Sequence, residues 1–208
     1  MLRELSLLIE PGQFNLVLGG NGAGKTTLLK VVSGMTRPDK GEVRFLNSGL
    51  SPIQSRGRIS FCSTESFLYE ELSLIENLRL FSTLSQIGPE RAQLLMERFE
   101  IAPNSTQLVS ELSSGVKKKA SLVRAFLANS DVLVFDEALN FLDNRGKNVL
   151  MELIAERTKE GSSVVFASNR PGELLAYADQ VINLSGGRLL SIENEALSAE
   201  LGQRMELH

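Results

Sequence analysis

Short apolar runs rich in Val, Ile, Leu and Phe alternate along the chain with longer stretches in which apolar residues recur at helical spacing. This alternation is typical of parallel strands joined by crossover helices, so we expect an α/β fold with a mostly parallel sheet. Turns containing glycine separate the first two runs and the last two, which predicts antiparallel hairpins at the sheet edges. The expected strands are 5–9, 14–18, 41–46, 58–62, 132–135, 164–167, 181–184 and 188–192.

The strand pattern disappears between about residue 64 and residue 115 and is replaced by helical spacing. We expect helices at 25–33, 72–84 and 90–99, and a short surface helix in the tail 192–208. The chain is interpreted as a single domain over 1–208. Its core is expected to be 1–63 and 116–208, and 64–115 is expected to form a helical subdomain.

A glycine-rich loop follows the expected strand 14–18 and precedes the expected helix that starts at Lys25. Its sequence, GGNGAGKT, matches the pattern GxxxxGK[ST] in full. In this arrangement backbone amides and the helix N-terminus attract phosphate, Lys25 reaches the β and γ oxygens, and Thr26 can ligate Mg²⁺. The loop alone does not choose among ATPases, GTPases and kinases. The residues expected to bind the nucleotide here are Gly19, Asn21, Gly22, Ala23, Gly24, Lys25, Thr26 and Thr27.

A second candidate segment is the apolar run 131–137, which ends in two acids, Asp136 and Glu137. The carboxyl ends of parallel strands share one edge of the sheet, so both acids are expected beside the phosphate loop. Asp136 is suited to hold Mg²⁺ together with Thr26, and Glu137 is suited to polarise the water that attacks the γ-phosphate. The alternative is that both are solvated acids that follow a strand.

Three further segments carry a resemblance to a known family. Leu112-Ser113-Ser114-Gly115-Val116 resembles the LSGGQ signature of ABC ATPases, with Ser114 in place of the first Gly and Val116 in place of Gln. Phe141-Leu142-Asp143 resembles the D-loop, and residues 68–78 resemble the segment after the Q-loop. Together with the phosphate loop and the acids, these matches identify the chain as a member of the ABC ATPase family.

The resemblance implies a P-loop NTPase core of the RecA-like type that takes ATP and Mg²⁺. It also implies a head-to-tail dimer, in which the signature of one subunit faces the nucleotide of the other, and a membrane permease that places the chain on the cytoplasmic side of the membrane. The residues that the resemblance adds to the nucleotide site are Ser113, Ser114, Gly115 and Asp143.

The chain departs from the family pattern at three places. Thr64 stands where the family has the Gln of the Q-loop, and Asn169 stands where it has the switch His; the only histidine is His208. The run 2–12 corresponds to the second strand of the family, so the strand that carries the adenine-stacking aromatic is expected to be absent. Asn169 can donate a hydrogen bond but cannot carry charge, so we expect hydrolysis that is slow but present, with Glu137, Lys25 and Asn169 as the catalytic groups.

Composition and charge limit the classes of partner that the chain is expected to bind. The net charge is −3 and the pI about 5.4, so no overall basic field favours nucleic acid. Lys117, Lys118 and Lys119 form the main basic cluster, interpreted as a solvated helix face rather than a phosphate patch. Cys62 is the only cysteine and is expected to be a buried strand thiol. No segment reaches the roughly 20 apolar residues that cross a bilayer, so membrane contact is expected through a partner.

Three functions stay open at this stage. The first is an ATPase that drives a membrane permease, a compact chain similar in size to the haem-exporter ATPases. The second is an ATP-binding module with little hydrolysis, which docks or pairs on binding ATP as the weak half of a heterodimer. The third is a soluble ABC protein that acts on nucleic acid or in cluster assembly, disfavoured by the acidic pI and the single cysteine. No residue identifies a transported substrate.

Overall fold

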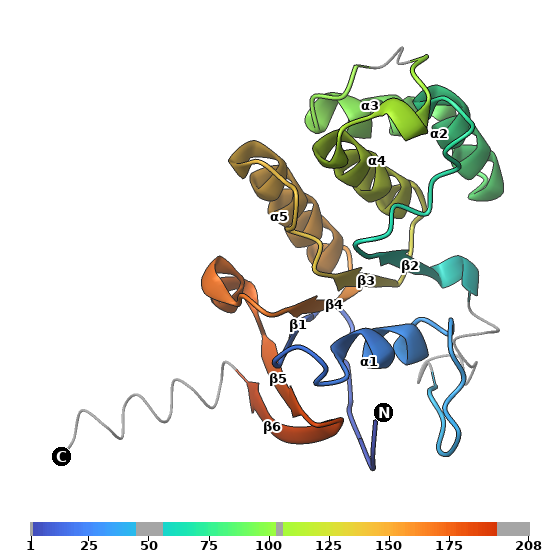
Figure 1. The fold of residues 1–208 in the computed structure, drawn as a ribbon. Coiled ribbons are helices and arrows are strands. Elements are labelled where there is room, and N and C mark those ends of the chain that lie inside the picture. The colour runs from blue at the N-terminus through green and yellow to red at the C-terminus, as the bar shows by residue number, and fades with distance from the viewer. Residues whose placement is uncertain (1, 45–55, 103–105, 195–208) are drawn as a thin grey trace.

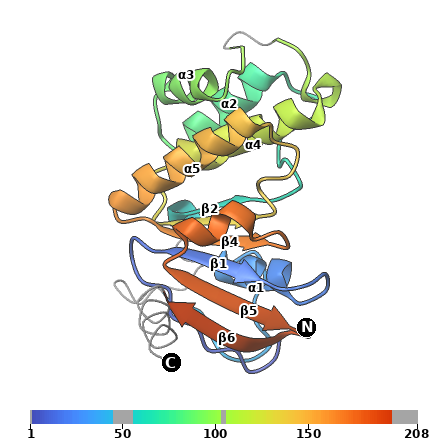
Figure 2. The same cartoon turned by 90° about the vertical axis from the view of Figure 1, so that its left-hand side faces the viewer.

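A computed structural model describes residues 2–44, 56–102 and 106–194, and within these ranges six strands form one sheet. The spatial order is β2-β3-β4-β1-β5-β6, and Figure 2 shows β4, β1, β5 and β6 following one another in this order. Five strands are parallel, and β6 runs antiparallel to β5 as the predicted hairpin. The strands are β1 Phe14–Leu18, β2 Ile59–Cys62, β3 Val132–Asp136, β4 Ser163–Ser168, β5 Gln180–Ser185 and β6 Arg188–Asn194. The α/β prediction is confirmed.

Helices cover both faces of the sheet (Figure 1). The helices are α1 Lys25–Val32, α2 Leu74–Leu84, α3 Pro89–Arg98, α4 Ser114–Leu127 and α5 Asn144–Lys159. Alternate residues of β3 point to opposite faces, as a strand requires. Val134 packs in the cluster with Leu28 of α1, while Leu133 and Phe135 pack in the cluster with α4 and α5. The strand β3 is therefore buried on both faces, which explains its continuous apolar run.

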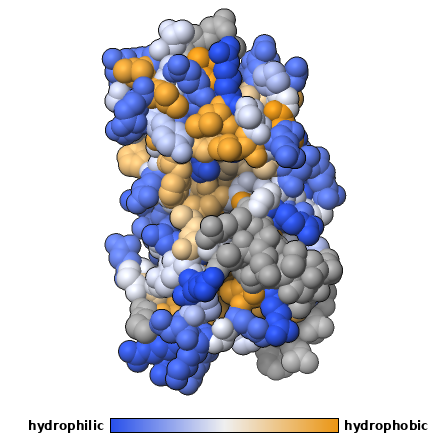
Figure 3. Space-filling view, turned by 90° about the vertical axis from the view of Figure 1, so that its right-hand side faces the viewer, coloured by the Kyte–Doolittle hydropathy of each residue, from blue (hydrophilic) through white to orange (hydrophobic). Residues whose placement is uncertain are grey.

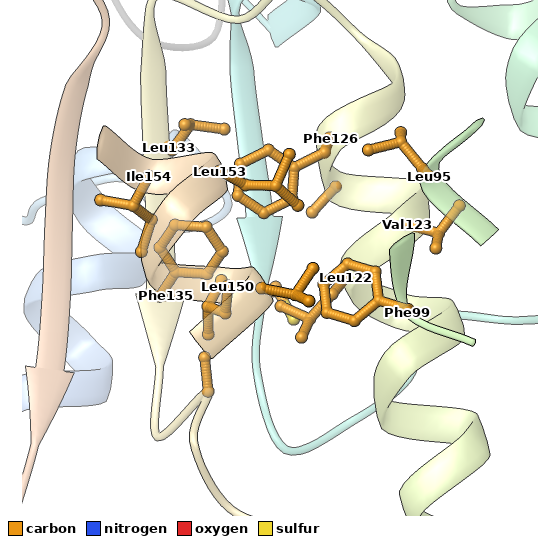
Figure 4. Packing of buried hydrophobic residues seen from close by; sticks show 14 of the residues in the cluster. Leu95, Phe99, Leu122, Val123, Phe126, Leu133, Phe135, Leu150, Leu153 and Ile154 are labelled. Carbon is orange, nitrogen blue, oxygen red and sulfur yellow. The ribbon is translucent and has the colours of Figure 1, made fainter. Parts of the chain in front are cut away.

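The larger core is built around aromatic rings between the sheet and the helices above it. Phe135 has its ring centroid 5.7 Å from that of Phe126 on α4 and 5.5 Å from that of Phe166 on β4. Figure 4 shows Phe126 and Phe135 packed together with Leu150 of α5. All four side chains are at most 1% exposed. This packing fixes β3, and with it the position of Asp136 at the end of that strand.

The segment 64–115 holds α2 and α3, which pack against each other and against α4 above the sheet. Ser73 caps α2 in a capping box with Glu76, because each side chain accepts a hydrogen bond from the backbone N–H of the other residue. The cap explains why α2 begins at Leu74 rather than at residue 72. The division into a core and a helical subdomain stays a prediction. In the described ranges, no helix combines the length and the apolar character needed to cross a membrane.

Three sequence predictions about secondary structure differ from the structure. Residues 5–9 form no strand, and β1 pairs instead with β4 and β5 on its two sides. Their alternating apolar side chains pack against the smaller core cluster, so the pattern reports one buried face rather than strand pairing. Residues 41–44 also form no strand, and 45–46 lie outside the described residues. Residues 192–194 belong to β6, and the rest of the expected tail helix lies outside the described residues.

Candidate functional site

The glycine-rich loop joins the carboxyl end of β1 to the first turn of α1. Gly24 is the N-cap of α1 in the left-handed region, with φ +105°, which glycine adopts at little cost. A Cβ at Gly19 would come within 2.5 Å of the carbonyl oxygen of Leu184 on β5, so the loop has no room for a side chain there. Among the described residues no side chain caps α1, and its own first turn holds no acidic residue. The backbone N–H groups at the helix N-terminus are thus not taken up by a cap.

Lys25 lies inside this loop rather than in solvent. Its side chain is 8% exposed, and Nζ donates to the carbonyl oxygens of Gly19 at 2.7 Å and Gly20 at 3.3 Å. The ammonium group is therefore folded back over the loop, on the side where the backbone converges. A ligand with phosphate oxygens at this loop would meet a cation that is already in place.

The second candidate segment meets the first at one short contact. Oγ1 of Thr26, on the first turn of α1, donates to Oδ2 of Asp136 at 2.6 Å. Asp136 ends β3 and is 6% exposed. The structure thus brings Thr26 and Asp136 together, although 110 residues separate them.

These two oxygens fit a magnesium ion in kind and in spacing. Mg²⁺ prefers oxygen ligands at about 2.0–2.1 Å in octahedral geometry, which separates adjacent ligands by about 2.9 Å. Thr26 and Asp136 would have to move apart by only a few tenths of an ångström. Among the residues that the structure describes, no three His, Cys, Asp or Glu side chains cluster as a metal cage. The arrangement suits an ion that also takes ligands from phosphate and water.

Glu137 and Asn169 also meet in the structure. The Asn169 backbone N–H donates to Oε1 of Glu137 at 2.8 Å, just after β4 ends. Glu137 has φ +51°, an unusual backbone conformation for a side chain of this size, and its own N–H donates to the carbonyl of Ala167. The carboxylate is therefore held from the strand next to β3. Strained residues of this kind concentrate at functional sites.

A small cavity of about 140 Å³ lies beside Thr26 and Asp136. Its other walls include Ser63, Thr64 and Glu65, which follow directly after β2. Thr64, predicted to stand at the position of the missing glutamine, is therefore beside the proposed metal ligands. The Thr64 hydroxyl is two carbons closer to the backbone than the amide of a Gln would be, which leaves space in this cavity beside Thr26 and Asp136.

The signature-like segment lies at the start of α4. Ser113 is its N-cap and accepts from the N–H of Val116 at 3.3 Å, and Ser113 and Ser114 are exposed. A Cβ at Gly115 would lie 3.3 Å from the carbonyl oxygen of Phe141, so the signature and the D-loop segment are neighbours. Within the described part of the chain, no hydrogen bond joins Ser113, Ser114 or Gly115 to the phosphate loop.

Asp143 caps α5 by accepting from the N–H of Gly146 at 2.7 Å. Its carboxylate also pairs with Lys119 of α4 at 2.9 Å. The hydrogen bond from Lys119, followed by the one from Gly146, holds the pKa of Asp143 below its usual value of 3.8. Asp143 therefore ties α5 to α4 beside the signature.

The lysine triplet was predicted to be a solvated helix face, and this is wrong for Lys118. Lys118 is 3% exposed, and its Nζ donates to the carbonyl of Ser63 at 2.7 Å and lies 3.8 Å from Sγ of Cys62. Cys62 itself is fully buried, as predicted. The helical spacing of the sequence could have predicted this burial. Lys118 precedes Leu122 by four residues and Phe126 by eight, so all three lie on the apolar face of the helix.

Comparison with known proteins supports the family resemblance. The family model for ABC transporters matches residues 2–140. The ABC transporter ATP-binding protein NatA from Bacillus subtilis is 29% identical over 196 residues, which cover 91% of this chain and 80% of that protein. The daunorubicin resistance ATP-binding protein DrrA3 from Streptomyces coeruleorubidus is 31% identical over 210 residues, covering 97% of this chain and 66% of that protein. These relatives do not test the narrower resemblance to haem exporters, which stays a prediction.

Solved structures agree with the sequence comparison. A structure described as the ATP binding subunit of an ABC transporter superposes with a TM-score of 0.88 at 25% identity, covering 98% of this chain and 88% of that one. A dimeric ATP-binding cassette bound to ADP and Pi has a TM-score of 0.82 at 21% identity, covering 93% and 90%, and this likeness shows the fold alone. Because the family model spans well over half of the chain, this protein belongs to the ABC transporter family, as one of its ATP-binding chains.

Proposed function

We propose that this chain binds Mg²⁺ and ATP, hydrolyses the ATP, and powers transport by a membrane permease. The observation that carries the proposal is the 2.6 Å contact between Thr26 and Asp136, which joins the phosphate loop to the acid-bearing strand. Glu137 follows at once, held by the Asn169 backbone. One end of the sheet thus offers hydrogen-bond donors for phosphate, metal ligands and a carboxylate base together.

The phosphates are bound at the loop. The backbone amides between Gly19 and Gly24, those of Asn21, Gly22 and Ala23 included, converge on them, and Thr26 and Thr27 add amides and hydroxyls at the helix N-terminus. Lys25 leaves the carbonyls of Gly19 and Gly20 or shares its protons with the β and γ oxygens. The ammonium starts from a nearly buried position, so little side-chain freedom is lost when ATP binds.

Thr26 would supply one oxygen ligand to Mg²⁺. Asp136, which accepts a hydrogen bond from the Thr26 hydroxyl in this structure, would hold the ion directly or through a water molecule. An ion held there would offset negative charge on the β and γ phosphates and polarise the γ-phosphorus. The acid at the buried end of β3 is in place before the ion arrives.

Glu137 orients the water that attacks the γ-phosphate and accepts its proton. The Asn169 N–H fixes one carboxylate oxygen, which leaves the other to accept a hydrogen bond from the water. The Asn169 side chain donates a neutral hydrogen bond to the γ-phosphate. Loss of a charged donor at such a position slows turnover by about 10²- to 10³-fold, so this ATPase is slow.

Ser113, Ser114, Gly115 and Asp143 complete the site of a second nucleotide-binding subunit in a head-to-tail dimer. Ser113 and Ser114 are exposed at the N-terminus of α4 and make no hydrogen bond to the loop of their own chain within the described ranges. Phe141, between the signature and Asp143, is 63% exposed, as expected of a residue that a second subunit covers.

The permease docks on the face to the right of Figure 1. A groove of about 640 Å³ lies there between β2 and the ends of α2 and α4, lined by Met35, Phe61, Phe81, Leu84, Ile87 and Arg124, among others. Figure 3 shows apolar side chains gathered on this face. Leu84 is 68% exposed and Met35 47% exposed. A short amphipathic helix of a membrane partner would bury these side chains and bring the chain to the membrane.

The test compares the wild type with Glu137→Gln, using the complex purified from gently solubilised membranes. We expect turnover to fall by at least about 10²-fold while Mg²⁺–ATP affinity is kept, because the base is lost and the binding groups remain. Glu71→Gln, a change at an exposed acid away from the site, is the control and should change neither quantity. Equal turnover in wild type and Glu137→Gln would favour an ATP-binding module instead of an ATPase. No affinity of the wild type for Mg²⁺–ATP would end both interpretations.

A further inference from the structure

Helix α4, which packs against β2, carries one buried cation, Lys118, and one half-buried cation, Arg124. Lys118 is 3% exposed and donates to the carbonyl of Ser63 at 2.7 Å. Arg124 donates to the carbonyl of Phe61 at 2.6 Å, and its guanidinium lies 5.5 Å from the ring centroids of Phe67 and Phe81. Among the described residues, neither cation forms an ion pair with an acid. Both are instead fastened to backbone carbonyls of one short segment.

Those two carbonyls lie at the outer edge of β2, the end strand of the sheet in the part of the chain that the structure describes. Arg58, just before β2, presents its carbonyl to Asp131, which precedes β3. In an extended chain the carbonyls alternate, so those of Phe61 and Ser63 point away from β3, toward the edge. Among the described residues, β2 has no neighbouring strand at this edge. Lys118 and Arg124 thus donate to two successive outward carbonyls, the acceptors that a further strand would otherwise use.

Ser63 is also the first residue of the wall beside the proposed metal ligands. Ser63, Thr64 and Glu65 line the cavity that Thr26 and Asp136 share. The Ser63 hydroxyl accepts from the N–H of Glu65 at 3.1 Å, so this wall is a closed turn. Lys118 therefore holds the turn from behind, at its first carbonyl.

Lys118 is also close to the signature, which lies at the start of the same helix. Lys118 follows Ser114, the first residue of α4, by four positions, which is about one helical turn. Its neighbour Lys119 pairs with Asp143 at 2.9 Å. A rotation or shift of the first turn of α4 cannot occur without moving the turn at Ser63, the pair with Asp143, or both.

Stability alone does not explain a lysine at this position. A buried ammonium group loses its hydration and regains only part of it from one carbonyl and a weakly accepting sulfur. An apolar side chain of similar length would avoid that cost. The cation is suited to a link that holds two segments at one distance.

We propose that Lys118 is a positioning residue that couples the two nucleotide sites of the dimer. The inference rests on the proposed function. Nucleotide and metal at Thr26 and Asp136 set the turn at Ser63. Lys118 passes that position to α4, and the signature at the start of α4 then fits the nucleotide of the second subunit. Binding at one site thereby prepares the contact that closes the other.

The experiment replaces Lys118 with Met, which is one atom shorter and removes the donor, with Leu, which also removes the donor, and with Gln, which keeps a donor. Lys117→Met is the matched control. Lys117 is the preceding residue of the same helix, and its Nζ donates to the Ser110 carbonyl at 3.2 Å and pairs with Glu70 at 3.5 Å, its two contacts among the described residues. Three quantities are measured for each protein: Mg²⁺–ATP affinity of the monomer by calorimetry, ATP-dependent dimerisation by sedimentation, and the thermal midpoint of unfolding.

We expect Lys118→Met to keep the monomer affinity and to have an unchanged or higher thermal midpoint. Its ATP-dependent dimerisation should weaken by about fivefold or more, a typical size for coupling between sites. Lys118→Gln should recover most of the dimerisation, and Lys117→Met should match the wild type.

Two results would overturn the inference while leaving the proposed function in place. One is a Lys118→Met protein that dimerises with ATP as the wild type does. The other is a fall of dimerisation, monomer affinity and thermal midpoint in parallel in Lys118→Met and also in Lys118→Leu, which would make Lys118 a structural residue only. A wild type that binds Mg²⁺–ATP but never dimerises would remove the dimer from the proposed function, and the inference with it.

Discussion

Thr26 Oγ1 lies 2.6 Å from Oδ2 of Asp136, so the phosphate loop and the acid strand share a hydrogen bond before any ion is bound. If both oxygens ligate Mg²⁺, the hydroxyl is required and its methyl group is not. Thr26→Val should lower the affinity for Mg²⁺ in the presence of ATP by about 10- to 100-fold, whereas Thr26→Ser should keep it. Titration of Mn²⁺, in place of Mg²⁺, by electron paramagnetic resonance measures this directly. Equal affinities in the Val and Ser variants would exclude the hydroxyl as a ligand.

Asn169 offers a gain-of-function prediction. Its backbone holds Glu137, and we propose that its side chain donates to the γ-phosphate without charge. Asn169→His adds a group that can carry a proton and a positive charge, so turnover should rise by about tenfold or more. Steady-state phosphate release measures the effect, with Asn169→Gln as the control that keeps a neutral donor. A histidine variant no faster than the glutamine variant would place the side chain away from the phosphate.

Phe135 tests how the core holds the site. Its ring packs between Phe126 and Phe166 and is fully buried, one residue before Asp136. Phe135→Ala should reduce the free energy of unfolding by about 3–5 kcal/mol, because the cavity it leaves cannot close between two rigid elements. Urea denaturation measures the loss. Leu84→Ala, at a side chain 68% exposed, should change stability by no more than about 0.5 kcal/mol.

The cap of α2 predicts a pH dependence of stability. Hydrogen bonds from the Ser73 side chain and backbone lower the pKa of Glu76 below 4.5 in the folded protein. A lowered folded pKa contributes stability above the unfolded pKa, and this contribution is lost as the pH falls through the folded value. The urea midpoint of the wild type should exceed that of Glu76→Gln at neutral pH, and the gap should shrink as the pH falls below 4.5. A gap that widens in acid would contradict the assigned hydrogen bonds.

The parallel sheet and the phosphate loop were predictable because their signals are local. β3 and β4 are buried on both faces, so each appears in the sequence as an unbroken apolar run. The loop motif fixes its own strand and helix, and the topology of the sheet then brings Asp136 to Thr26.

Other features depend on contacts that a local pattern does not encode. Residues 5–9 alternate as a strand would, yet both edges of β1 are already taken by β4 and β5. Lys118 appeared solvated within a basic triplet, and only its place on the apolar face of α4 betrays its burial. The hydrogen bond from the Asn169 backbone to Glu137 joins two loop residues and has no sequence signal at all.

The two cations that α4 places on the outward carbonyls of β2 also bear on how the chain behaves at high concentration. An uncovered sheet edge is a template on which a strand of another molecule can add, and such growth leads to aggregates. Here the carbonyl oxygens of Phe61 and Ser63 already accept hydrogen bonds. A strand added from another molecule would have to displace a charged side chain from each of them. The edge of the sheet nearest the proposed permease groove is thereby protected against the addition of strands from other molecules.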